Sequence, residues 1–212
     1  MTPWFRNLSK EFLQTAYLRG SFLWRLPVGA QNAVSLTFDD GPDPVYTPAI
    51  LEVLARYDAK ATFFMIGSNV ERYPDLAREV VRQGHAVGGH TYNHKVIVTL
   101  PRPELADELA CCRRAILNAT GVDTRLFRPP RGQVSFASVR LVAQLGYKLV
   151  HWSKTYSDYR CDGTSGLLHR MNEDPAMNRD ILLFHDTNPY TVEALSSIIP
   201  AWQSRGLCFH LL

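Results

Sequence analysis

Two short segments carry side chains that could bind a metal ion and move a proton. In 36-LTFDDGPDP-44, Asp39 and Asp40 follow an apolar run and precede Gly-Pro, which alone indicates a strand that ends in a turn. In 90-HTYNH-94, His90 and His94 lie four residues apart, a spacing that is also common without a ligand. Together, two imidazoles and one carboxylate make a catalytic metal site with an open position for water, and the second carboxylate is then free to act as a base.

The elements that must position these side chains alternate between short β-rich runs and helical patterns. Seven strands are predicted, near 33–38, 61–67, 85–89, 125–130, 147–153, 180–186 and 207–212, with six helical segments between them. Thr47 followed by Pro48 predicts a helix N-cap. Strict alternation implies parallel strands with right-handed crossovers, in an open sheet or a barrel. No GxGxxG follows the first strand, so a dinucleotide site is not favoured.

The reactive side chains fall at the carboxyl ends of these strands. The two aspartates follow the first strand and the two histidines follow the third; the others are Arg128 after the fourth, Asp158 beyond the fifth, and His185 and Asp186 at the end of the sixth. In a parallel α/β barrel those ends face one mouth, where active sites are built from the loops. We therefore expect a single site. Asp43 and Asp186 are interpreted as loop and capping residues, with a supporting role at the metal as a second option for Asp186.

Length and composition restrict the class of protein. A chain of 212 residues and 24.0 kDa fits one domain with a single core. A net charge of +3, without a long run of Lys or Arg, gives no reason to expect a nucleic-acid partner. The four cysteines have no metal-ligand spacing and are expected to be reduced or buried thiols, which favours a reducing compartment.

Residues 1–32 are expected to form an amphipathic helical extension, and residues 33–212 the catalytic domain. The extension has a helical apolar stripe flanked by basic residues, made of Phe5, Leu8, Phe12 and Ala16. Such a stripe more often packs over the end of a domain than on a membrane surface, so membrane contact is the second option. Its charges leave no apolar core for a secretory signal, and no run reaches the ~20 apolar residues of a membrane span. The sequence thus favours a cytoplasmic protein, with membrane association as the alternative.

Five segments resemble, in order, the five motifs of the polysaccharide deacetylase family, whose domain is also called the NodB homology domain, carbohydrate esterase family 4. They are TFDDGPDP, GHAVGGHTYNH, FRPPRG, WSKTYSDY and ILLFHD, and the resemblance covers about residues 33 to 210. It implies an irregular, TIM-like (β/α) barrel of about seven parallel strands and a metal-dependent hydrolase. Asp40, His90 and His94 match the metal ligands. The resemblance implies one divalent ion, Zn²⁺ by default, with Co²⁺, Ni²⁺ or Mn²⁺ as alternatives.

The resemblance also assigns catalytic roles. Asp39 matches the base that takes a proton from water, and Arg128 matches the arginine that orients it. His185 matches the general acid that protonates the departing amine, and Asp158 the carboxylate that holds this histidine protonated. In this mechanism the metal ion binds both the water and the acetyl carbonyl.

The remaining assignments concern the oxyanion and the substrate pocket. The backbone N–H of Arg131 matches the donor that stabilises the tetrahedral oxyanion. Leu183, Tyr159 and Pro130 match residues around the acetyl group. Two of these positions depart from the family pattern, because many members have tyrosine at position 131 and tryptophan at position 159. An arginine at the cleft mouth could meet an anionic group on the substrate, or be an ordinary solvated side chain.

The implied reaction is removal of the N-acetyl group from N-acetylhexosamine units of a glycan, oligosaccharide or lipid-linked sugar, with release of acetate. One alternative is an O-acetyl esterase or deformylase on a modified sugar, which uses the same metal chemistry with a different leaving group. A non-enzymatic alternative is a glycan-binding pseudoenzyme, which requires a lost ligand, base or acid. The sequence does not define an oligomeric state.

Overall fold

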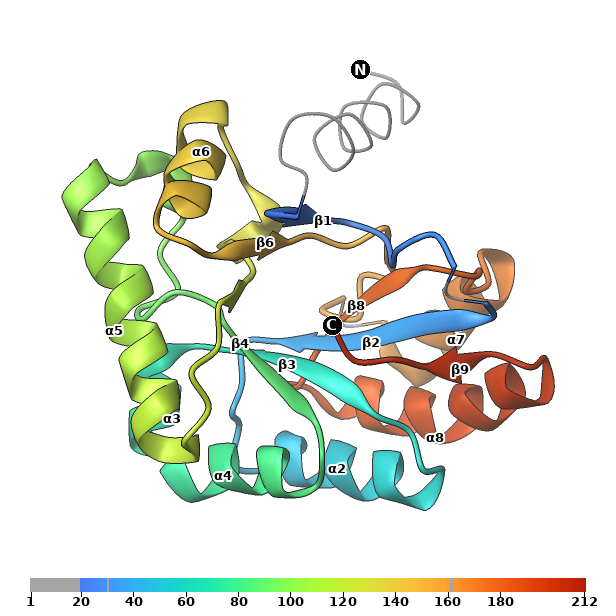
Figure 1. Ribbon diagram of the computed structural model, residues 1–212. Helices are drawn as coiled ribbons and strands as arrows, with labels where there is room; N and C mark the ends of the chain where they lie inside the picture. Colours follow the sequence, from blue (N-terminus) through green and yellow to red (C-terminus); the bar gives the residue numbers. More distant parts are fainter. Residues whose placement is uncertain (1–19, 30, 161) are drawn as a thin grey trace.

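The computed structural model describes residues 20–29, 31–160 and 162–212 (Figure 1). The apolar stripe of the expected extension lies outside the described residues. Among the helices that are described, none is long and apolar enough to cross a membrane.

Strands and helices alternate along the described chain as the hydrophobic pattern predicts. The strands are β1 (Phe22–Leu23), β2 (Ala33–Asp39), β3 (Ala61–Met65), β4 (Ala86–Gly89), β5 (Leu126–Phe127), β6 (Lys148–Val150), β7 (Lys154–Thr155), β8 (Ile181–His185) and β9 (Cys208–Phe209). The helices are α2 (Tyr46–Arg56), α3 (Gly67–Arg72), α4 (Pro74–Arg82), α5 (Arg102–Thr120), α6 (Phe136–Gln144), α7 (Gly163–Glu173) and α8 (Pro189–Ser204), with 3₁₀ turns η2 (Ile97–Thr99) and η3 (Pro130–Gly132). All seven expected strands and all six expected helices are present, and β1, β7 and α3 are additional.

The strands form one parallel sheet that curls into a barrel. Their order is β1-β6-β5-β4-β3-β2-β8-β7, with β9 on β2, and every ladder between named strands is parallel. Figure 1 shows α2, α4 and α8 along one side of the sheet, α5 on a second side and α6 beyond β6. Because helices cover the sheet outside and side chains fill it inside, all seven residues of β2 are buried. The expected (β/α) barrel is confirmed.

Between β6 and β7 the chain crosses from one side of the curled sheet to the other. β6 pairs with β5, and the chain then crosses to β7, which pairs with β8. Within the crossing, the Ser153 N–H donates to the carbonyl of Ile181 at 3.1 Å, and the Ile181 N–H donates to the Ser153 hydroxyl at 3.0 Å. The expected fifth strand, 147–153, therefore ends at Val150 in β6, and the chain then bends to form β7 at the far edge of the sheet.

Phe22 and Leu23 lie within the range expected for the extension, 1–32, and form a strand. These residues make β1 and pair with Leu149 and Val150 of β6. Phe22 packs with Trp24 against the side of the core that contains Phe127. Two residues are too few for a period-2 pattern, so no strand was predicted here, and the domain boundary at residue 33 stays a prediction.

The expected N-cap of α2 is also wrong in detail. The helix begins at Tyr46, and the side chain of Asp43 accepts hydrogen bonds from the N–H groups of Val45 and Tyr46 at 2.8 and 2.9 Å. The N-cap position is Val45, and Asp43 in the preceding loop satisfies the first N–H groups of the helix, in keeping with its expected loop and capping roles. Thr47 is fully buried instead, and its hydroxyl donates to Asp186 at 2.5 Å. A contact 139 residues away in sequence overrides the local preference of Thr-Pro for an N-cap.

The thiols in the described residues are free, as expected. Cys112 is buried in the core, Cys111 is partly buried and Cys208 is exposed, while Cys161 lies outside the described residues. Burial raises the pKa of the Cys112 thiol to about 12, which makes it an inert core residue.

Candidate active site

The predicted side chains meet in one cleft at the carboxyl ends of the strands. The cleft has a volume of about 610 Å³, and its lining includes Asp40, His90, His94, Arg131, Tyr159, Leu183 and His185. The register of the sheet explains part of this arrangement, since Asp39 at the end of β2 is the lateral partner of His185 at the end of β8. Parallel strands bring their carboxyl ends to the same edge, so residues far apart in sequence arrive together.

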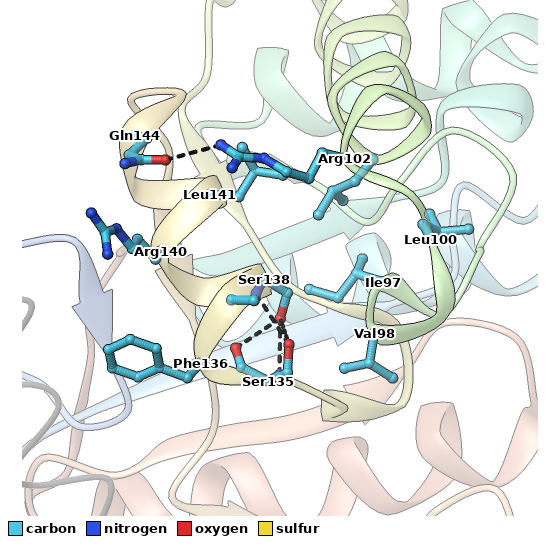
Figure 2. A pocket seen from close by; sticks show the side chains of 12 residues that line it. Ile97, Val98, Leu100, Arg102, Ser135, Phe136, Ser138, Arg140, Leu141 and Gln144 are labelled. Atoms are coloured by element: carbon cyan, nitrogen blue, oxygen red, sulfur yellow. Dashed lines mark hydrogen bonds between the residues drawn. The ribbon is translucent and has the colours of Figure 1, made fainter.

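A second cavity, of about 490 Å³, lies between α6 and the η2–α5 junction (Figure 2). Arg102 extends across it toward Gln144, and Ser135 caps the start of α6 nearby. The described residues that line it include no His, Asp, Glu or Cys, so it offers neither a metal ligand set nor a general base. The chemistry is therefore confined to the cleft at the strand ends.

Asp40, His90 and His94 form the only group of potential metal ligands of its kind among the described residues. Their ligand atoms all lie within 4.8 Å of one another. Oδ1 of Asp40 is 3.4 Å from Nε2 of His90 and 3.2 Å from Nε2 of His94. Within the described part of the chain, this buried oxygen has no hydrogen-bond partner. The three atoms thus converge on one point instead of bonding to each other, which is the arrangement that a shared cation requires.

The backbone and one buried glutamate hold the two histidines in place. Nδ1 of His90 donates to the carbonyl of Arg128 at 2.8 Å, which leaves the Nε2 lone pair free for a metal ion. The segment from Tyr92 to His94 is a tight turn, in which His94 has a φ of 56°. Glu108 of α5 accepts hydrogen bonds from the N–H groups of Tyr92 and Asn93 at 2.9 and 2.8 Å. Sequence analysis missed Glu108, because its position on α5 reads as an ordinary helical residue.

The charges around Asp40 also suit a metal ligand. Burial disfavours its charged form, but the imidazoles of His90 and His94 and the charge of His185 outweigh this effect and hold the pKa of Asp40 well below its usual range. The carboxylate is therefore ionised at neutral pH. Two neutral imidazoles and one carboxylate are a ligand set that fits Zn²⁺ and other divalent transition metals.

One carboxylate oxygen of Asp39 is held by Arg128, and the other is free. Its Oδ1 accepts a hydrogen bond of 2.7 Å from Nη1 of Arg128, while its Oδ2 is 3.8 Å from Nε2 of His90. Arg128 is fully buried, and the same Nη1 donates to the hydroxyl of Thr37 at 2.6 Å. Its guanidinium lies 4.1 Å from the centre of the Phe64 ring. Burial lowers the pKa of Arg128, opposed by the charge of Asp39.

His185 and Asp158 form a second pair on the other side of the cleft. Nδ1 of His185 donates to Oδ1 of Asp158 at 2.8 Å, and Oδ2 of Asp158 accepts from the His185 N–H at 2.7 Å. Thr191 at the start of α8 donates to the same Oδ2 at 2.8 Å. Burial disfavours the imidazolium, but the hydrogen bond and charge of Asp158, with the charges of Asp39 and Asp40, raise the pKa of His185 to about 9.

We expect the raised pKa of His185 to be measurable in the metal-free protein. Its ring should titrate near pH 9 by NMR, and Asp158→Asn should lower the pKa because it removes the neighbouring charge. Since the folded pKa exceeds the unfolded value of about 6.5, the charged ring stabilises the fold fully below that pH, and this contribution is lost as the pH rises through about 9. Equal titration curves for wild type and Asp158→Asn would contradict this account.

The residues assigned to the oxyanion and the acetyl pocket mostly line the cleft. Arg131 lies in η3 with a φ of 59°, and Leu183 and Tyr159 are on the wall, where the Tyr159 ring meets that of His185 edge-on at 5.9 Å. Pro130 is buried and is not among the described residues that line the cleft. The lining residues that the sequence analysis missed are Trp152, Thr155, Thr187 and Asn188. Trp152 follows β6, and Thr187 and Asn188 follow β8, so their place after predicted strands was the available signal, whereas Thr155 ends β7, which was not predicted.

Comparisons with known proteins identify the family of the chain. The family model for polysaccharide deacetylase matches residues 23–150. A peptidoglycan-N-acetylglucosamine deacetylase of Bacillus cereus is 34% identical over 95% of this chain and 94% of its own length. A chitooligosaccharide deacetylase of Azorhizobium caulinodans is 31% identical over 86% of this chain and 93% of its own. Among solved structures, a peptidoglycan N-acetylglucosamine deacetylase in complex with 4-naphthalen-1-yl-N-oxidanyl-benzamide superposes with a TM-score of 0.85, at 27% identity, over 91% of both chains. On the evidence of its motifs, barrel and relatives, the chain belongs to the polysaccharide deacetylase family.

Proposed function

We propose that this protein is a metal-dependent carbohydrate N-deacetylase that hydrolyses the N-acetyl group of N-acetylglucosamine units in a glycan or oligosaccharide. The observation that carries the proposal is the complete set of groups in one cleft: three convergent ligand atoms, a free carboxylate oxygen beside them, and a partly buried imidazolium opposite. The family and the names of the relatives support a carbohydrate deacetylase. Metal dependence and the sugar are the further steps of the proposal.

Asp40, His90 and His94 would hold the divalent ion. That ion supplies Lewis-acid chemistry, because it polarises the acetyl carbonyl and makes water more acidic. The free Oδ2 of Asp39 is placed to accept the proton of the attacking water, since its Oδ1 is already bonded to Arg128. The guanidinium of Arg128 fixes the orientation of this base and supplies a counter-charge beside a second carboxylate.

His185 completes the reaction on the leaving-group side. Amines are poor leaving groups when unprotonated, so the C–N bond breaks as the nitrogen takes a proton from Nε2 of His185. Asp158 occupies Nδ1, which directs Nε2 into the cleft and keeps the ring charged at neutral pH. The backbone N–H of Arg131 is our candidate donor to the oxyanion, since backbone donors fixed before the reaction stabilise developing charge.

Acetate release from defined sugars tests the proposal. The metal-free protein, reconstituted with Zn²⁺, should release acetate from N-acetylglucosamine oligomers together with an equal amount of free amine, and chelation should stop the reaction. Co²⁺, Ni²⁺ and Mn²⁺ would be compared in the same assay. Acetate without new amine, from O-acetylated sugars only, would support the esterase alternative, and formate from formylated sugars would support a deformylase.

The binding-only alternative makes a different prediction. A glycan-binding pseudoenzyme should bind the oligomers without releasing acetate under any of these metals. The described residues argue against it, because every assigned ligand, acid and base is present and positioned. No acetate from any sugar at saturating metal would overturn the proposed enzyme.

A further inference from the structure

A buried carboxylate outside the assigned set lies directly beneath the loop that carries Asp40. Asp186 is 1% exposed, and its Oδ2 accepts a hydrogen bond of 2.5 Å from the hydroxyl of Thr47. Its Oδ1 has no hydrogen-bond partner among the described residues. Its backbone N–H donates to the carbonyl of Asp39 at 3.3 Å, so Asp186 contacts the β2 loop through both its main chain and its side chain.

The contact with the loop depends on Gly41. A Cβ atom at this position would meet Oδ2 of Asp186 at 2.1 Å, and both other carboxyl atoms within 2.6 Å. Only a residue without a side chain can therefore lie against the carboxyl. The same turn is held by two hydrogen bonds of 2.9 Å, from the Asn69 side chain to the carbonyl of Asp40 and from the Ile66 N–H to the carbonyl of Gly41.

A carboxyl group buried in this place does not favour the stability of the fold. Burial raises the pKa of Asp186 to about 7; the hydrogen bond from Thr47 opposes the rise, and the negative charges of Asp40 and Asp39 add to it. An apolar side chain of similar size would avoid the loss of hydration that a buried carboxyl suffers. Polar groups retained in buried places without full pairing are often part of a functional site.

We propose that Asp186 is a positioning residue for the metal site: its carboxyl, held by the Thr47 hydroxyl, packs against Gly41 and fixes the backbone that presents Asp40. The inference goes beyond the proposed function and depends on it for the identity of the ligand. It also links the two halves of the site, because Asp186 directly follows the general acid His185 on β8.

Metal affinity is the property that should change. Thr47→Val keeps the shape of the side chain but removes the hydroxyl, which donates to Asp186 and accepts from the Asp43 N–H at 2.8 Å. Asp186→Ala removes the carboxyl and leaves the bond between Thr47 and Asp43 in place. Each is expected to weaken Zn²⁺ binding by ~10- to 100-fold, the usual effect of losing a group that orients a metal ligand. Asp186→Asn can still accept the bond from Thr47 and should stay within about threefold of wild type. The dissociation constant is measured by competition with a chromogenic chelator.

Two controls separate positioning from general damage. Thr62→Val removes another buried threonine hydroxyl, one that accepts from the Leu212 N–H at 3.2 Å and lies on β3, so it should leave Zn²⁺ affinity unchanged. Excess Zn²⁺ should restore acetate release in Thr47→Val and Asp186→Ala, because weakened metal binding can be overcome by concentration whereas misfolding cannot.

A double-mutant cycle tests the contact itself. Gly41→Ala should weaken Zn²⁺ binding at least ~10-fold, because the new methyl group collides with the carboxyl. Adding Asp186→Ala makes room for that methyl group, so the double variant should bind Zn²⁺ no more weakly than Gly41→Ala alone.

Additive losses in the double variant, or wild-type affinity in Thr47→Val and Asp186→Ala, would overturn the inference. A large loss in Asp186→Asn equal to that in Asp186→Ala would do the same, because charge and not position would then be the cause. Failure of the proposed function gives another result: wild type binds Zn²⁺ and the variants weaken it, but none releases acetate. A wild type that binds no Zn²⁺ contradicts both.

Discussion

Asp39→Asn is expected to lower the turnover number by ~10²- to 10⁴-fold while Zn²⁺ remains bound, because the variant loses the base but none of the three ligands. Acetate release and bound metal would be measured on the same sample. Asp40→Asn is the matched control: it should lose metal affinity, and its activity should depend on the Zn²⁺ concentration. Equal metal loss in both variants would show that the two carboxylates do not have separate roles.

The same substitution should also destabilise the fold. Asparagine in place of Asp39 leaves the fully buried guanidinium of Arg128 without its counter-charge. Breaking a buried ion pair from one side typically costs ~3–5 kcal/mol of the free energy of unfolding. Denaturant unfolding would measure this cost. Combining Asp39→Asn with Arg128→Met removes both charges and should recover part of the stability without recovering activity.

His185→Ala is expected to lower turnover on N-acetylated sugars by ~10²- to 10⁴-fold, since the departing amine then lacks a proton donor. The loss should depend on the leaving group. The leaving group of an aryl acetate ester is a stable phenolate, which departs without taking up a proton. The variant should therefore keep most of its activity on such an ester. The turnover numbers of wild type and variant on the two substrates give the comparison.

A uniform loss of activity on the amide and on the aryl ester would contradict the role of His185 as general acid. Asp158→Asn serves as an intermediate case, because it keeps the ring but removes the group that holds it charged. Its activity on the amide should fall at lower pH than that of wild type, as the pKa of His185 moves down.

Much of the site could be predicted because the residues with reactive side chains stand at the ends of predicted strands. Asp39, His90, Arg128 and His185 each end or follow a β-rich run, and parallel strands necessarily bring such positions to one edge. Most of the expected helices were equally clear, since they are long enough to show a 3.6-residue period, whereas the pattern near 166–172, which forms α7, was weak. Fold class and ligand set therefore follow from local patterns plus one general rule about parallel sheets.

The features that could not be predicted depend on contacts far apart in sequence. β1 and β7 have two residues each and become strands only through their neighbours β6 and β8. Thr47 fits an N-cap by its local sequence, and only the folded chain brings Asp186 to its hydroxyl. Glu108 is likewise an unremarked helical residue until the turn after β4 folds onto it. Neither the hydrophobic periodicity nor a short motif indicates such contacts between distant residues.

The crossing from β6 to β7 also shapes the cleft, and this limits how the substrate range can be altered. Trp152 lies in the crossing and Thr155 in β7, and both line the cleft. Because β7 pairs with β8, a longer or shorter crossing would change the wall of the cleft and the strand pairing at this edge of the sheet together. Thr187 and Asn188 line the same cleft after β8, but the Asn188 side chain caps α8. Engineering for bulkier glycans would therefore begin at Thr187, which belongs to no strand and caps no helix.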